Sequence, residues 1–280
     1  MLCYKRRKDI ERVLKIVKGE GKKVGFLPTM GALHDGHVSL LRQSKRAGEI
    51  TVCSIFVNPT QFNQQEDFVK YPITTASDLL ILSQNDCDIV FLPEVSEIYP
   101  NGTTTKTLNL GKITTILEGA HRLGHFDGVA QVVGILLDII SPHHLYMGQK
   151  DFQQVMVVQK LIEVKPYKTR LVICPTQREK DGLAMSSRNV RLTPENRIHA
   201  LSLSKVLFYI KENYRNLSNE KLVELSYELL SKTPEIKIEY LNIVSKYSLE
   251  PIETGNQSEP AIALLAAWVG NVRLIDNILL

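Results

Sequence analysis

The chain has 280 residues, of which 44% are hydrophobic and 23% are charged. These fractions are close to the averages for soluble globular domains, and they exclude a disordered, collagen-like or coiled-coil chain. Its 34 basic and 30 acidic residues leave a formal net charge of +4. That excess is too small to indicate a nucleic-acid partner, although it suits a protein that handles phosphate groups. At about 150 residues per domain, the length allows one large domain or two modest ones.

The sequence shows no targeting or membrane segment. The basic residues near the start are not followed by an apolar stretch, as a secretory signal would require. The longest apolar run, residues 261–269, is far shorter than the ~20 residues that a membrane span needs. The cysteines Cys3, Cys53, Cys87 and Cys174 form no CxxC pair, which excludes the usual patterns of a disulfide framework and a zinc ribbon. We therefore expect a cytoplasmic protein without a membrane partner.

The first 175 residues alternate helical patterns with short β-branched runs. In chain order, the patterns predict a helix at 8–18, a strand at 24–27, a helix at 37–46, a strand at 50–57, a helix at 75–84, a strand at 88–92, helices at 128–140 and 152–164 that flank a strand at 145–147, and a strand at 170–174. Continuous apolar strands between helices are typical of a parallel sheet covered on both faces. The prediction is an α/β, Rossmann-like doubly wound parallel sheet.

The pattern changes after Pro175. Helices are predicted at residues 194–213 and 218–231, followed by extended runs at 237–244, 261–269 and 272–277. Gly270-Asn271 between the last two runs is a two-residue hairpin signal. We therefore predict a Rossmann-like domain over residues 1–175 and a smaller C-terminal α+β domain over residues 176–280.

A glycine- and histidine-containing segment follows the first predicted strand. The sequence PTMGALHDGH, residues 28–37, leads directly into a helix near His37. Ligands of open α/β sheets bind at the carboxyl ends of the strands, and a helix N-terminus there favours a phosphate. His34 and His37 could both donate to that phosphate, while Gly31 and Gly36 let the backbone come close to it. The alternatives are an ordinary turn with two surface histidines, or a zinc pair that lacks further ligands at the usual spacing.

Two more polar segments contain candidate phosphate ligands. GQKD, residues 148–151, follows a predicted strand and places Lys150 within reach of the same crevice. GLAMSSRN, residues 182–189, offers the hydroxyls of Ser186 and Ser187 beside the guanidinium of Arg188, a combination suited to an oligophosphate. The alternatives are a solvated lysine at a helix start and a polar linker with a capping serine.

Neutral polar groups follow the second strand. Asn58 and Gln61, in NPTQF, offer donors and acceptors for a small polar substrate; the alternative is an asparagine–proline turn. Further along, EGAHRLGHFDG contains His121 and His125 at a spacing that resembles a metal pair, but we expect this segment to be a structural loop.

The order of these segments is more informative than any one of them. The HxGH turn and the MSSR loop resemble the HIGH and KMSKS elements of the HIGH-motif nucleotidylyltransferase superfamily. The full series PTMGALHDGH, VNPTQF, YP at 71–72, EGxxRxGHFDGV, GQKDFQQ and DGLAMSSRN resembles the pantothenate synthetase (pantoate–β-alanine ligase, AMP-forming) family, from about residue 25 to residue 196. Two positions depart from the family pattern: Ile73 replaces a usual arginine and Leu123 a usual proline.

The resemblance implies an activity. A carbon–nitrogen ligase of this family condenses (R)-pantoate with β-alanine to pantothenate, through a pantoyl adenylate, and releases AMP and pyrophosphate from ATP. Mg²⁺ would arrive with ATP, held mostly by phosphate oxygens and water, with no dedicated protein ligands. The implied partners are these small-molecule substrates and a second copy of the chain in a homodimer, with no nucleic acid. The second domain would act as a lid.

The resemblance also implies site residues. His37, His34, Lys150 and Arg188 would be catalytic, with His37 the proton donor, and Gln61, Gln154 and Asn58 would bind or lie near pantoate, with Gln61 also facing β-alanine. The implied ATP contacts are Met30, Gly31, Ala32, Leu33, His34, Asp35, Gly36, His37, Gly148, Gln149, Lys150, Asp151, Gln177, Met185, Ser186, Ser187 and Arg188.

Two other functions remain as alternatives. A nucleotidylyltransferase that adds AMP or CMP to a phosphorylated acceptor would need further basic residues, whereas GQKDFQQ offers neutral glutamines. A nucleotide- or RNA-binding module without turnover would be expected to carry a basic stripe with interleaved aromatic residues, which the sequence lacks.

Overall fold

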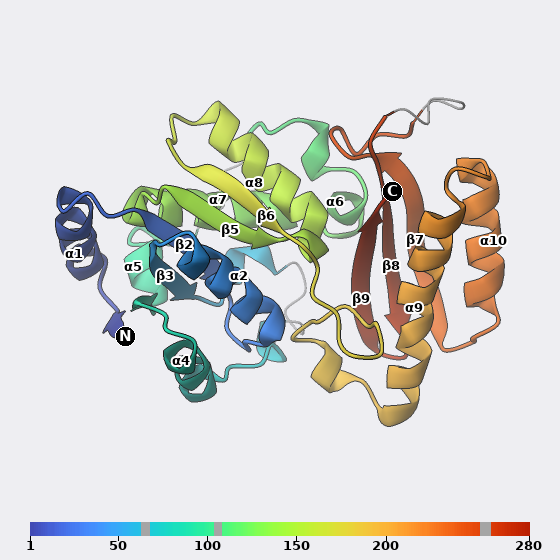
Figure 1. Ribbon diagram of the computed structural model, residues 1–280, viewed down its shortest axis with the longest axis horizontal. Helices are drawn as coiled ribbons and strands as arrows, with labels where there is room; N and C mark the ends of the chain where they lie inside the picture. Colours follow the sequence, from blue (N-terminus) through green and yellow to red (C-terminus); the bar gives the residue numbers. More distant parts are fainter. Residues whose placement is uncertain (63–67, 104–107, 253–258) are drawn as a thin grey trace. The chain divides into compact units, whose positions relative to one another are not determined.

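The computed structural model describes residues 1–62, 68–103, 108–252 and 259–280 (Figure 1). They form two compact units, one of residues 1–148 and 153–175 and the other of residues 149–152 and 176–280. Residues 149–152, which the sequence pattern places with the first domain, pack with the second unit. Within the described ranges, none of the helices combines the length and the apolar character that crossing a membrane requires.

The first unit is built on a six-stranded parallel sheet with the order β1-β4-β3-β2-β5-β6. Its strands are β1 (Leu2–Tyr4), β2 (Val24–Thr29), β3 (Ile50–Ile55), β4 (Ile89–Phe91), β5 (His144–Gly148) and β6 (Arg170–Cys174). The chain winds outward from β2 in one direction through β3 and β4, and in the other through β5 and β6. The boundary between β2 and β5 is therefore the switch point at whose carboxyl end such sheets bind ligands.

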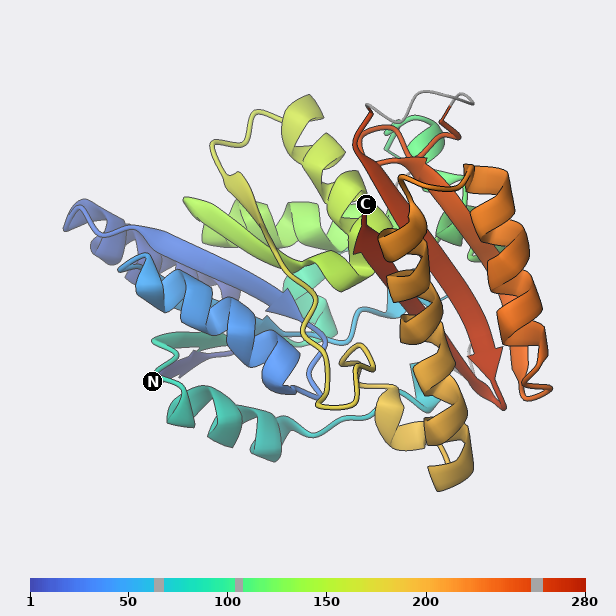
Figure 2. The same ribbon diagram turned by 45° about the vertical axis from the view of Figure 1, so that its right-hand side comes forward.

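Helices cover both faces of this sheet. They are α1 (Arg7–Gly19), α2 (Asp35–Arg46), α4 (Thr75–Gln84), α5 (Val95–Ile98), α6 (Glu118–His121), α7 (His125–Ile140) and α8 (Phe152–Val164), with 3-10 turns η1 (Pro59–Gln61) and η2 (Lys112–Thr114). Side chains of α1, α7 and α8 share one apolar core with the strands, and those of α2 and α4 share another. In Figure 2, α2 (light blue) lies in front of β2 (blue). Because both faces of the sheet are covered, the sequences of its strands are continuous apolar runs.

The second unit pairs helices with a three-stranded antiparallel sheet of order β7-β8-β9. Its elements are η3 (Gln149–Asp151), η4 (Asn189–Arg191), α9 (Pro194–Asn213), α10 (Asn219–Ser231), β7 (Ile236–Ser245), β8 (Ala261–Val269) and β9 (Val272–Leu279). Both helices pack on the sheet around one apolar core. Gly270 has φ +55°, the left-handed conformation that the hairpin between β8 and β9 uses. The predicted fold class is confirmed.

A buried polar cluster joins the amino ends of three strands of the first unit. The carboxylate of Glu49 pairs with His144 and accepts hydrogen bonds from the Tyr146 hydroxyl at 2.9 Å and from Ser44 Oγ at 3.3 Å. Burial and the adjacent Glu49 carboxylate raise the pKa of Tyr146 above its ordinary value. Gly25 lies against this cluster, and a Cβ added there would overlap Ser44 Oγ and the Glu49 carboxylate.

We predict that Gly25→Ala destabilises the protein by about 1–3 kcal/mol, because the added methyl group forces a closely packed site apart. Gly19→Ala is the matched control, since a Cβ at Gly19 meets nothing within 4 Å; its effect should stay within about 0.5 kcal/mol. Urea unfolding followed by circular dichroism measures both. Equal unfolding midpoints for the two variants would contradict this packing.

Candidate active site

The turn between β2 and α2 is held by a buried carboxylate. Asp78 of α4 accepts hydrogen bonds from the backbone N–H of Leu33 at 2.8 Å and of Ala32 at 3.1 Å. Gly31 and Ala32 have φ values of +82° and +49°, so the turn uses two consecutive left-handed residues. A Cβ at Gly31 would lie 2.9 Å from Asp78 Oδ2, so only glycine lets the carboxylate come this close. Asp78 was not among the site residues predicted from the sequence.

His34 and His37 cap the N-terminus of α2. Nδ1 of His34 accepts from the N–H of Gly36 at 3.1 Å, and Nδ1 of His37 accepts from the N–H of His34 at 3.3 Å. The centres of the two rings lie 4.1 Å apart. A neutral imidazole that accepts at Nδ1 carries its proton on Nε2. Each ring is therefore set to donate from Nε2, at a helix end whose partial charge is positive.

Gln61, in η1, is oriented by two neighbours. Its amide oxygen accepts from Asn58 Nδ2 at 3.1 Å, and its amide nitrogen donates to Met30 Sδ at 2.9 Å. Asn58 is only 1% exposed. Its amide also donates to the Gly128 carbonyl at 3.2 Å and accepts from the Tyr99 hydroxyl at 2.7 Å. The sequence suggests Asn58 as a substrate-binding group, but the amide is directed toward the chain itself and fixes Gln61.

The EGAHRLGHFDG segment is not the continuous loop that we expected: it contains α6 and the first turn of α7, joined by residues 122–124. His121 is exposed, whereas His125 is buried with Nδ1 2.8 Å from the carbonyl oxygen of Gln61. The two histidines therefore have different environments.

The glutamines at the start of α8 also differ. Gln153 is buried; its amide nitrogen donates to the carbonyls of Ile113 and Ile116, both at 2.8 Å, and its oxygen accepts from the Glu118 N–H at 3.0 Å. Gln154 is partly exposed. The hydrogen bonds of Gln153 hold the segment before α7 in place. Gln154 is therefore the glutamine of this pair that we consider a candidate for binding a ligand.

A cavity of about 430 Å³ opens at the carboxyl ends of β2, β3 and β4. Its lining includes Met30, Asp78 of α4, and Ile73, which is one of the two residues that depart from the family pattern. The two departures, Ile73 and Leu123, are both on the surface, each 77% exposed. Neither substitution therefore alters the buried bonds that hold the candidate site residues.

In the second unit, one asparagine fixes the GQKD segment. Asn277 of β9 is buried and donates from Nδ2 to the carbonyls of Gln149 at 2.9 Å and Lys150 at 2.8 Å. It also accepts from Gln149 Nε2 at 3.1 Å. Nζ of Lys150 lies 3.5 Å from the carboxylate of Asp151. These bonds explain why residues 149–152 pack with the second unit.

The MSSR loop is anchored by a partly buried ion pair. Both terminal nitrogens of Arg178 donate to the Asp276 carboxylate, at 2.6 and 3.0 Å, and one donates to the Gly182 carbonyl at 3.1 Å. Within the loop, the Met185 N–H donates to the Gln177 carbonyl at 2.9 Å.

The end of the MSSR loop is fixed by its own serine. The N–H of Arg188 donates to Ser186 Oγ at 3.2 Å. This bond fixes the backbone from which the side chains of Ser187 and Arg188 extend. Hydroxyls and a guanidinium on a fixed backbone are groups that bind phosphate oxygens.

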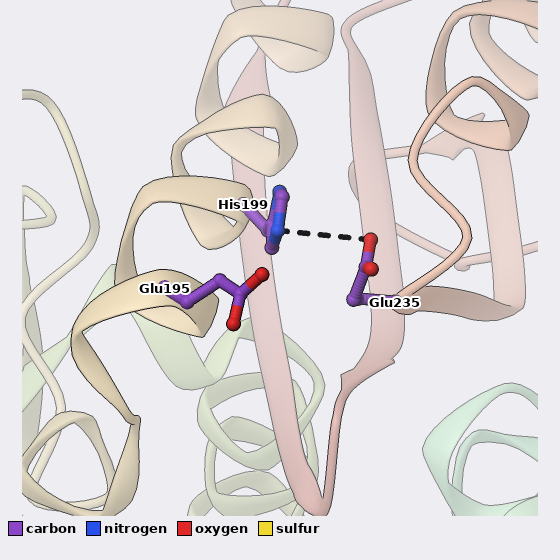
Figure 3. Close-up of side chains that lie close together, drawn as sticks. All are labelled: Glu195, His199 and Glu235. Atoms are coloured by element: carbon purple, nitrogen blue, oxygen red, sulfur yellow. Dashed lines mark ion pairs between the residues drawn. The ribbon is translucent and has the colours of Figure 1, made fainter.

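One further set of possible metal ligands lies elsewhere in the second unit. Glu195 and His199 of α9 face Glu235, and the ligand atoms lie within 4.8 Å of one another (Figure 3). An imidazole with two carboxylates can hold Zn²⁺. The His199–Glu235 ion pair, at 3.6 Å, accounts equally well for the proximity, and both carboxylates are exposed. We therefore assign no cofactor role to this cluster.

The described residues thus supply two groups of polar side chains. In the first unit, the structure brings together Met30, Asn58 and Gln61, and sets the Nε2 atoms of the two capping histidines for donation. In the second unit, it fixes the segments that carry Lys150 and Arg188. Chemically, these are imidazole, ammonium and guanidinium donors for phosphate and amides for a small polar ligand.

Comparisons with known proteins agree over nearly the whole chain. A family model described as pantoate-beta-alanine ligase matches residues 3–279. The pantothenate synthetase of Bacteroides fragilis is 40% identical over 271 residues, covering 97% of this chain and 96% of that protein. The pantothenate synthetase of Cytophaga hutchinsonii is 45% identical over 268 residues, covering 94% of this chain and 93% of that protein.

Solved structures show the same similarity. The pantothenate synthetase of Thermus thermophilus has a TM-score of 0.92 and 36% identity, with 99% of each chain covered. The pantoate-beta-alanine ligase of Francisella tularensis, solved in complex with beta-gamma ATP and beta-alanine, has a TM-score of 0.82 and 36% identity, covering 100% of this chain and 97% of that one.

The role of Asp78 can be measured directly. We predict that Asp78→Ala loses about 2–4 kcal/mol of stability, because two buried N–H groups lose their acceptor. Asp78→Asn, which keeps one acceptor oxygen, should fall between this variant and the wild type. Amide hydrogen exchange at Ala32 and Leu33 should accelerate in the same order. Unchanged exchange at both amides in the alanine variant would show that the carboxylate does not hold the turn.

Proposed function

Because the chain belongs to the pantoate–β-alanine ligase family and is a ligase, we propose that it condenses (R)-pantoate with β-alanine at the expense of ATP. The products would be pantothenate, AMP and pyrophosphate, and the intermediate a pantoyl adenylate. The observation that carries the proposal is the pair of capping histidines at the carboxyl end of β2. Their Nε2 donors stand at the helix N-terminus beside the switch point of the sheet, where charge developing on a phosphate would be stabilised.

In the first half-reaction, a carboxylate oxygen of pantoate attacks the α-phosphorus of ATP. A new oxygen–phosphorus bond forms, and the bond to the pyrophosphate oxygen breaks. The transferred group gains negative charge on its outer oxygens, which His34 and His37 would neutralise by donating from Nε2. His37 is the proposed proton donor. The protein forms no covalent bond in this step, so its contribution is to orient the reactants and to stabilise the developing charge.

Several segments of the chain would hold the nucleotide. We assign residues 30–37 and 148–151 to ATP, together with Gln177, Met185, Ser186, Ser187 and Arg188. Lys150 and Arg188 would follow the charge of the phosphates during adenylation. Residues 1–175 would bind nucleotide and pantoate, and residues 176–280 would serve as a lid.

Mg²⁺ would enter with ATP as part of the substrate. Asp35 and Asp151 are the carboxylates of the proposed ATP segments; Asp35 is exposed and the side chain of Asp151 is 49% exposed. Two accessible carboxylates fit a hydrated ion that is held mainly by phosphate oxygens and water, which is the usual mode for Mg²⁺ with nucleotides. The ion would neutralise phosphate charge.

Pantoate would be bound by Gln61 and Gln154. Because Asn58 donates to the amide oxygen of Gln61, the amide nitrogen of Gln61 is oriented as the donor. Its acceptor Met30 Sδ is a weak one, so a substrate oxygen could replace it at little cost. Asn58 would then act through Gln61 and not by direct contact with pantoate.

In the second half-reaction, the neutral amine of β-alanine attacks the activated carbonyl carbon. The carbon–nitrogen bond forms, the carbon–oxygen bond to AMP breaks, and the amine releases one proton to solvent. Gln61 would face this substrate too. We propose that the enzyme acts in the cytoplasm as a homodimer, on small molecules alone.

The reaction is tested with purified protein, ATP, Mg²⁺, pantoate and β-alanine, with products identified by mass spectrometry. We expect pantothenate with equal amounts of AMP and pyrophosphate. Without β-alanine, labelled pyrophosphate should still exchange into ATP when pantoate is present. Pantothenate formed with ADP and phosphate would exclude the adenylate, and AMP transfer to a phosphorylated acceptor would favour the nucleotidylyltransferase alternative.

The catalytic assignments predict a large loss of turnover without a loss of fold. His37→Asn keeps an acceptor at the position of Nδ1, which preserves the helix cap, but removes the Nε2 donor. This variant and Lys150→Met should each lower turnover by ~10²–10³, the usual loss for one preorganised donor. His121→Ala, at an exposed position outside the site, is the control and should resemble the wild type. Near-normal turnover in either site variant would remove that residue from the mechanism.

A further inference from the structure

A chain of buried and partly buried polar side chains connects α6 and α7 to the turn that carries Gln61. His125 is the first residue of α7, and its Nδ1 lies 2.8 Å from the Gln61 carbonyl oxygen. Its Nε2 lies 3.2 Å from Nη1 of Arg122. That same guanidinium nitrogen is 3.9 Å from the carboxylate of Glu118, whose side chain is 8% exposed. None of these three residues belongs to the substrate contacts assigned above.

The partners of His125 fix which nitrogen carries the proton. A carbonyl oxygen can only accept, so Nδ1 of His125 donates to Gln61. A guanidinium can only donate, so Nε2 of His125 accepts from Arg122. The imidazole is therefore held in one orientation and one tautomer, opposite to that of the capping histidines of α2.

Two further contacts join η1, the turn that carries Gln61, to α7. Asn58 donates to the Gly128 carbonyl at 3.2 Å. A Cβ added at Gly128 would overlap the Thr60 carbonyl and would lie 2.8 Å from Gln61 Cα, so the helix and the turn touch through their backbones. With the hydrogen bond from His125, η1 is therefore fixed to the first turn of α7 at three points. The position of the Gln61 amide is set by this helix.

We propose that His125 is a positioning residue for pantoate activation. It holds the backbone of Gln61 so that the Gln61 amide donates to pantoate at the correct place, while Arg122 and Glu118 hold His125. This inference rests on the proposed function, since it concerns the residue assigned there to pantoate. It predicts that the hydrogen bond from Nδ1 matters more for pantoate than the bond at Nε2.

Two substitutions separate these hydrogen bonds. In His125→Asn, the side-chain amide nitrogen is bonded to Cγ, as Nδ1 is in histidine, so the donor to Gln61 is kept and the acceptor for Arg122 is lost. In His125→Gln, the amide lies one bond further out, so the acceptor for Arg122 is kept and the donor to Gln61 is lost. His121→Asn and His121→Gln are matched controls, four residues earlier at an exposed position.

The readouts are pantoate-dependent pyrophosphate exchange, kcat and KM for pantoate, ATP affinity by calorimetry, and the urea unfolding midpoint. We expect kcat/KM for pantoate to fall about 10²-fold in His125→Gln, the usual effect of misplacing a positioning group by about 1 Å. His125→Asn should lie closer to the wild type than to the glutamine variant. ATP affinity should be unchanged in both variants, and the controls should match the wild type.

Each other outcome overturns the proposal. Equal activity of the two His125 variants, or equal loss of pantoate and ATP binding, would reduce His125 to a structural residue. If both variants lost stability to the same extent and kept full activity per folded molecule, the positioning role would also fall. Failure of the wild type to catalyse the exchange would instead overturn the proposed function, and this inference with it.

Discussion

The carboxylate of Asp78 is the constraint on which the proposed nucleotide site depends. The turn from β2 to α2 contains two consecutive left-handed residues, Gly31 and Ala32, and the N–H groups of Ala32 and Leu33 donate to a side chain and not to a backbone carbonyl. A buried N–H without an acceptor costs about 1–3 kcal/mol, so the turn needs one from elsewhere. Asp78 supplies it from α4. The capping histidines of α2 come directly after this turn, so their position follows from it.

The other candidate segments are held in the same manner. Irregular backbone that carries candidate ligand-binding side chains is fixed by a buried polar group on a strand or helix: Asn277 of β9 for GQKD, Asp276 of β9, through Arg178, for the MSSR loop, and His125 of α7 for the turn of Gln61. The proposed reaction aligns three substrates and would gain from such rigidity, because misplaced donors lose most of their effect.

The sequence was sufficient for the fold because apolar periodicity marks the elements. The predicted bounds of α4, α8, α9 and β8 coincide with the observed ones. The pattern missed β1, whose three residues at the sheet edge are too short to show a period. It also took α6 for a loop, because the glycines of EGAHRLGHFDG obscure a single helical turn.

The candidate ligand-binding residues were proposed because most of them follow predicted strands, where open sheets place their sites. The groups that hold them were not, because their partners are distant in the sequence. Asp78 is 45 residues from Leu33, and Asn277 is 127 residues from Lys150. A signal did exist for Asp78: it shares the buried face of α4 with Leu82, one turn later, where a carboxylate needs a hydrogen-bond partner. For Asn277, no local pattern marked the residue.

In the proposed reaction, the carboxylate of pantoate becomes bonded to the α-phosphorus of ATP before the amine attacks. Pantoate labelled with ¹⁸O in its carboxylate tests this directly, since the bridging oxygen leaves with AMP when the carbon–nitrogen bond forms. We expect one labelled oxygen in the phosphate of each AMP, measured by mass spectrometry, and the other retained in the amide of pantothenate. AMP without label, beside labelled inorganic phosphate, would contradict it.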